Sequence, residues 1–196
     1  MKGIALTSIR YGMKDKAVRF LLLVTFAQVF AVQALNMYWQ PFFKGHHICE
    51  SNLGYVFAGI MASVAIGSLI IARMKCAGKE KTMILWVQII AGVFVIISAV
   101  IASLPMIMTF FLLHEAMRGM DAPLKSGYLQ KRIPSAERAT ISSFCAISPH
   151  IGGVFGLLLS DLIAQSFGIS VAWIVSGSVL IVVPLLLMRN DSHASD

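Results

Sequence analysis

Charged residues are scarce in this chain. Asp, Glu, Lys and Arg make up 13% of its 196 residues, whereas hydrophobic residues make up 58%. Charged residues form about a quarter of a typical soluble domain, so the composition excludes an ordinary soluble protein. A mean hydropathy of +0.81 indicates instead an integral membrane protein that lies in a lipid bilayer.

Cysteine is also rare, and the common motifs of enzymes are missing. Cys49, Cys76 and Cys145 are widely spaced and odd in number, which indicates neither a disulfide framework nor a zinc pattern. No phosphate-binding glycine loop and no His-Glu-x-x-His pair is present, because His114-Glu115 is followed by Arg118 rather than by a second ligand. We therefore expect neither an enzyme nor a cofactor.

Acidic residues are outnumbered by basic ones, 9 against 16, which gives a net charge of +7. The basic residues lie between apolar runs, where they indicate membrane topology rather than binding to nucleic acid. One membrane-spanning helix needs about twenty apolar residues. Runs near this length lie at roughly 20–43, 53–72, 83–103, 105–125, 139–163 and 169–188. We expect an all-α membrane protein with six spans.

The basic residues predict the orientation of these spans. Lys and Arg number five before the first span, four at 73–82, four at 125–138 and one in the tail, whereas the opposite side has Lys44 alone. This bias places both termini of a multi-pass protein in the cytoplasm. Two cytoplasmic segments would flank the transmembrane domain at 20–188. They are a tail at 189–196 and a leader at 1–19, which is either an amphipathic surface helix or unstructured.

The first span has a polar face and an aromatic end. Gln33, Asn36 and Gln40 are three and four residues apart, so they share one side of a helix. Such a stripe either lines a cavity or forms hydrogen bonds between helices. The aromatic residues at 38–43 predict an anchor at the lipid headgroups. In the following loop, His46, His47, Cys49 and Glu50 allow a metal site, but an ordinary loop is the favoured interpretation.

The fourth span, at 105–125, conflicts with a purely lipid environment. Insertion scales assign about −0.3 to −0.6 kcal/mol to a central Leu, Ile or Phe and about +2.5 to +3.5 kcal/mol to a central charge. The span carries Glu115 and Arg118 together, and His114, Arg118 and Asp121 follow one helix face. One interpretation is a static salt bridge between Glu115 and Arg118. The other is a functional site, because ionisable residues inside membranes usually mark solute or ion pathways.

The fifth span adds a second histidine. Pro149 predicts a bend, because a proline inside a span frees backbone carbonyls. Counting about 1.5 Å per residue from each end puts His150 at the depth of His114 and Glu115, near the middle of the membrane. His150 is then either a proton-carrying partner of Glu115 or a histidine bonded to a neighbouring carbonyl.

The other spans look structural. The second is rich in small residues, which favours close helix packing. The third and sixth, at 83–103 and 169–188, have few polar side chains and predict lipid-facing supports.

The chain resembles the C-terminal half of a bacterial major facilitator superfamily transporter. The resemblance covers nearly everything from residue 17 onward, and the stretch from Arg118-Gly-Met-Asp-Ala-Pro-Leu to Ser143 is its most specific part. It implies two inverted three-helix repeats, half of the family's fold. It also implies that the first, second, fourth and fifth spans line a cavity. The family's N-terminal half would be supplied separately.

We therefore predict transport of a small organic solute by alternating access, with expected proton coupling. Gln33, Asn36 and Gln40 would bind solute, and His114, Glu115, Arg118, Asp121 and His150 would form the intramembrane charge and proton site. The expected partners are an N-terminal half-transporter or a second copy. The alternative is a membrane assembly protein, or an inactive fragment of a split or truncated transporter, whose polar faces only hold helices together.

Overall fold

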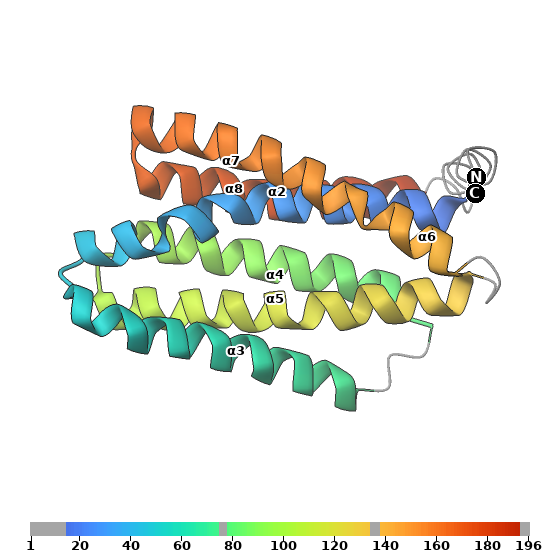
Figure 1. Ribbon diagram of the computed structural model, residues 1–196, viewed down its shortest axis with the longest axis horizontal. Helices are drawn as coiled ribbons and strands as arrows, with labels where there is room; N and C mark the ends of the chain where they lie inside the picture. Colours follow the sequence, from blue (N-terminus) through green and yellow to red (C-terminus); the bar gives the residue numbers. More distant parts are fainter. Residues whose placement is uncertain (1–14, 75–77, 134–137, 193–196) are drawn as a thin grey trace.

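The computed structural model describes residues 15–74, 78–133 and 138–192, and almost all of them are helical. Figure 1 shows a bundle of long helices that run back and forth along one axis. The elements are α2 (Lys16–Gly45), η1 (Glu50–Asn52), α3 (Leu53–Arg73), α4 (Glu80–Val100), α5 (Leu104–Arg132), α6 (Arg138–Cys145), α7 (Ile147–Phe167) and α8 (Ile169–Ser192).

The expected all-α membrane fold is confirmed. By length and composition, α2, α3 with η1, α4, α8 and the segment Ile141–Phe167 could each cross a membrane. The sixth long helix, α5, has 29 residues but is less apolar because it carries the charged side chains described below. The predicted transmembrane domain covers 20–188, but the first helix begins before it and the last helix ends after it. Residues 1–14 of the predicted leader lie outside the described residues.

The start of α2 and the break in the fifth span follow from single residues. The Asp15 carboxylate accepts hydrogen bonds from the backbone N–H groups of Ala17 and Val18, at 2.8 and 3.0 Å, and so begins α2 at Lys16. Pro149 has no N–H to donate to the carbonyl of Cys145, and its ring crowds that carbonyl. α6 ends at Cys145 and α7 begins at Ile147, so the helix is interrupted one turn before the proline.

The helices pack as two inverted three-helix repeats. α2 lies against α7 and α8, α5 lies correspondingly against α3 and α4, and α4 and α8 lie against each other. Exchanging α2, α3 and α4 with α5, α7 and α8 leaves these contacts unchanged, although α7 also packs against α8 whereas α3 does not pack correspondingly against α4. In Figure 1 the helices α7, α8 and α2 accordingly form one layer, and α4, α5 and α3 the other.

Glycines allow close approach at equivalent seams of the two repeats. A Cβ at Gly67 of α3 would lie 1.9 Å from the carbonyl oxygen of Ala116 in α5, and one at Gly119 would lie 2.2 Å from the α3 backbone. On α7, a Cβ at Gly152 or Gly156 would lie 2.7 or 2.4 Å from carbonyl oxygens of α2. The predicted packing role of small residues is thus confirmed for Gly67.

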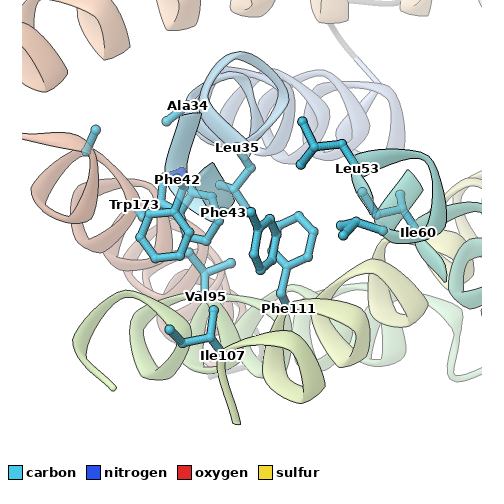
Figure 2. Close-up of a cluster of buried hydrophobic side chains, with 12 residues drawn as sticks. Ala34, Leu35, Phe42, Phe43, Leu53, Ile60, Val95, Ile107, Phe111 and Trp173 are labelled. Carbon is cyan, nitrogen blue, oxygen red and sulfur yellow. The ribbon is translucent and has the colours of Figure 1, made fainter. Parts of the chain in front are cut away.

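An aromatic cluster fills the core at the end of α2. The Trp173 ring of α8 stacks on Phe42 and Phe111, with centroids 4.0 and 5.3 Å apart, and Phe43 meets Phe111 edge to face (Figure 2). Phe42 and Phe43 are buried. These two side chains therefore face the core and not the headgroups, because α4, α5 and α8 enclose this end of α2. The depth of the aromatic end in the membrane stays a prediction.

The third span is more enclosed than predicted. Of the apolar window of α4, 56% is buried, against 22% for the window of η1 and α3 and 29% for that of α6 and α7. α4 is flanked by α5 on one side and α8 on the other, so it is part of the core, and it also keeps an exposed apolar face with Trp86, Ile90 and Val93. α3 and α7 expose the most apolar surface instead.

Candidate functional site: two ion pairs on α5

Four charged side chains on α5 form two ion pairs. Arg118 Nε lies 3.0 Å from Glu115 Oε2, and Lys125 Nζ lies 2.6 Å from Asp121 Oδ2. The partners are three and four residues apart, and this spacing places them next to each other on the same helix. We call Glu115–Arg118 the open pair and Asp121–Lys125 the closed pair, because their surroundings differ.

The open pair is partly exposed and connects to α2. The Arg118 side chain is 27% exposed and the Glu115 side chain 3%. Arg118 Nη1 donates to Asn36 Oδ1 at 2.9 Å, and Asn36 Nδ2 donates to Gln33 Oε1 at 3.3 Å. Glu115 Oε2, which lies closest to Arg118, has no hydrogen-bond partner among the described residues, so this contact is an ion pair without a hydrogen bond. The structure thus brings Gln33, Asn36, Glu115 and Arg118 into one polar chain.

The closed pair is sealed by amides from two other helices. Gln28 of α2 accepts from Lys125 Nζ at 2.6 Å, and Gln88 of α4 donates to Asp121 Oδ1 at 3.1 Å. Lys125 and Asp121 are only 12% and 6% exposed. Each charge therefore has an opposite charge and a neutral partner, an arrangement that joins α2, α4 and α5.

His114 faces α4 rather than the open pair. It is 1% exposed, and its Nδ1 lies 3.1 Å from the carbonyl oxygen of Ala91. A carbonyl only accepts hydrogen bonds, so Nδ1 carries the hydrogen. The role of His114 as a proton carrier stays a prediction, and the contact shown is a bond to a neighbouring carbonyl.

His150 is not brought to Glu115. It lies exposed on α7, which packs against α2 and α8, whereas α5 packs against α3 and α4. Equal depth in the membrane does not fix the side of the bundle on which a residue lies. The pairing of Glu115 with His150, and their equal depth in the membrane, stay predictions. Gln40 of the predicted solute stripe is likewise exposed, at the end of α2.

The sequence is similar to that of known membrane transporters along most of its length. The model of the family described as Major Facilitator Superfamily matches residues 21–196. The chain belongs to the major facilitator superfamily. It is also 26% identical over 183 residues to the Uncharacterized MFS-type transporter YxaM of Bacillus subtilis (strain 168). The matched region covers 92% of this chain and 45% of that protein. No solved structure gave a significant match.

The chain thus spans less than half the length of this relative. Membership of the superfamily confirms the resemblance seen in the 118–143 stretch, of which residues 134–137 lie outside the described part of the chain. It also supports the membrane location and a transport role in general terms.

The described part of the chain contains a further polar contact, between α2 and α7, that the sequence did not predict. The Tyr38 hydroxyl of α2 donates to Asp161 Oδ1 of α7 at 2.6 Å, and Gln165 donates to Asp161 Oδ2 at 2.8 Å. Asp161 was a usable signal, because it is a carboxylate inside an apolar span. Gln28 and Gln88 are harder to recognise in the sequence, since an isolated amide in a span has no spacing pattern.

The loop between α2 and α3 shows ordinary contacts. Glu50 pairs with Lys44, and the His46 ring packs 4.8 Å from that of Phe42. Within residues 15–74, 78–133 and 138–192, no three His, Cys, Asp or Glu side chains are grouped to hold a metal ion.

Proposed function

We propose that this chain is one half of a transporter that moves a small organic solute across the plasma membrane by alternating access. The superfamily match and the transporter relative of about twice the length support this. Its partner would be an N-terminal half-transporter or a second copy of the chain, which supplies the other wall of the cavity.

The open pair carries the proposal. It offers solute a partly exposed guanidinium in Arg118 and amides in Gln33 and Asn36, and an exposed Gln40 extends the same stripe. Donors and acceptors on one polar face suit a solute that has both kinds of group. The closed pair has no such open side.

Glu115 is the candidate proton carrier. When Glu115 binds a proton, Arg118 loses its anionic partner and becomes available to an anionic group of the solute. In this proposal His150 shares no proton with Glu115 directly, because it lies on α7, which packs against α2 and α8 rather than against α5.

Uptake into proteoliposomes that contain the chain with its other half tests the proposal. A Glu115→Gln variant should still reach the membrane but lose the pH dependence of uptake. The matched control is Glu50→Gln, which changes an exposed acidic residue in the loop and should leave uptake unchanged. If Glu115→Gln keeps the pH dependence of the wild type, Glu115 has no coupling role.

The proposed orientation has both termini in the cytoplasm and the loop around Cys49 outside. Cys49 is an exposed free thiol. A membrane-impermeant maleimide added to intact cells should label it, whereas a Cys49→Ser variant should lose that label. Labelling only after the cells are opened would show that this loop faces the cytoplasm and that the proposed orientation is wrong.

A membrane assembly protein is the second candidate, and the exposed faces of α3 and α7 favour it. Tyr55, Phe57 and Leu69 of α3 and Phe155 and Leu158 of α7 are all at least half exposed. Such faces suit either lipid or a partner helix. Crosslinking in native membranes distinguishes the candidates: a partner with no uptake supports assembly, whereas uptake that requires the partner supports transport.

A further inference from the structure

A small cavity lies where α2, α4, α5 and α8 meet. Its volume is about 10 Å³, and its lining includes Gln28, Gln88, His114, Asp121 and Leu180. A cavity needs about 10–15 Å³ of this kind to hold one water molecule. The space is therefore at the lower limit for a single water, and too small for an organic solute.

Two buried acceptor atoms of residues that line this cavity have no partner. Because His114 Nδ1 donates to Ala91, Nε2 of the neutral ring is an acceptor. The amide of Gln88 is oriented by its donation to Asp121, which leaves Oε1 as the free end. Neither His114 Nε2 nor Gln88 Oε1 has a hydrogen-bond partner among the described residues, although His114 is 1% and Gln88 2% exposed.

We propose that one water molecule occupies this cavity and donates one hydrogen to His114 Nε2 and the other to Gln88 Oε1. Water is the smallest ligand with two donors, which is what two unpartnered acceptors that line one small cavity require. It is favoured over a cation because the charges around the site already balance. On α5, Arg118 pairs with Glu115 and Lys125 with Asp121, whereas α2, α4 and α8 contribute to the lining only uncharged residues.

This water links the two repeats. α4 belongs to the first repeat and α5 to the second, and the bonds from His114 to Ala91 and from Gln88 to Asp121 already cross the same seam. The water adds a third connection between the same pair of helices. The inference does not depend on the proposed transport function, because it rests on hydrogen bonding within this chain alone.

Nitrogen NMR of the full chain in lipid bilayers, with ¹⁵N-labelled histidine, tests the proposal. The resonances of His114 are assigned by their loss in a His114→Gln variant. We expect one protonated nitrogen, Nδ1, and one unprotonated Nε2 at a hydrogen-bonded shift that receives magnetisation from water. In a Gln88→Met variant, Nε2 should move towards the shift of a free imine nitrogen, whereas a Gln40→Met control should leave it unchanged.

The wild-type spectrum decides the question even where Gln88→Met fails to fold. Two protonated nitrogens would mean that the ring donates to Gln88, and the proposal would be wrong. An Nε2 at the free shift, with no transfer from water, would show a dry cavity and overturn it equally. A structure that shows density between the two acceptor atoms would support it.

Discussion

The open and closed pairs lie within three turns of one helix, yet their surroundings differ. Arg118 of the open pair is 27% exposed and reaches a single amide chain on α2. Lys125 and Asp121 of the closed pair are 12% and 6% exposed and are held from two sides, by Gln28 and Gln88. A pair with an open side can exchange partners, whereas a sealed pair resists change because any lost partner leaves a buried charge.

This difference separates function from structure on α5. Both pairs have the same charges and nearly the same spacing, so the sequence pattern alone does not distinguish them. The neighbouring amides do. We therefore assign solute and proton chemistry to the open pair and the joining of helices to the closed pair.

Breaking the closed pair should have the largest effect. Asp121→Asn leaves the Lys125 ammonium buried without its counter-ion, and removing one partner of a buried pair costs about 3–5 kcal/mol. Unfolding in mild detergent, followed by circular dichroism, measures this loss. Adding Lys125→Met to Asp121→Asn should restore part of the stability, and a double variant less stable than the single one would argue against the closed pair as described.

A substitution that pushes α5 away from α3 should weaken both ion pairs. Gly119 lies between them, and a side chain there would press on the α3 backbone, which cannot rotate away. Gly119→Ala should cost about 1–3 kcal/mol or more of stability and reduce uptake. Gly54→Ala is the matched control, since its Cβ would meet nothing within 4 Å. Equal stability of the two variants would contradict the close approach.

Neutralising the open pair should affect stability less than transport. Glu115→Gln keeps the shape of the side chain and leaves Arg118 partly solvated, so a loss of about 1 kcal/mol is expected. The same unfolding measurement checks this value. A loss as large as that of Asp121→Asn would mean that the open pair is structural.

The smallest effect should come from the amide stripe. Asn36→Ala removes one hydrogen bond to Arg118, which contributes about 0.5–1.5 kcal/mol to stability. We expect a higher KM for solute with little change in folding. Gln130→Ala, on the remote end of α5, should leave KM unchanged, and an unchanged KM in Asn36→Ala would remove the residue from the solute site.

Most of the fold could be predicted from the sequence because apolar length and helical spacing are local properties. The six spans, the salt bridge at Glu115 and the packing role of Gly67 all follow from such patterns. The enclosure of α4 between α5 and α8 could not be predicted, because polarity does not determine which neighbours a helix has. Tyr38 and Asp161 lie 123 positions apart in the chain, and only the packed bundle brings them together.

Double-mutant cycles on the two pairs test the central claim most directly. The single and double variants of Asp121→Asn with Lys125→Gln, and of Glu115→Gln with Arg118→Gln, are compared by their free energies of unfolding. The account predicts a coupling energy of about 2–3 kcal/mol for the closed pair and below about 1 kcal/mol for the open pair. Equal coupling energies, or a larger value for the open pair, would contradict it.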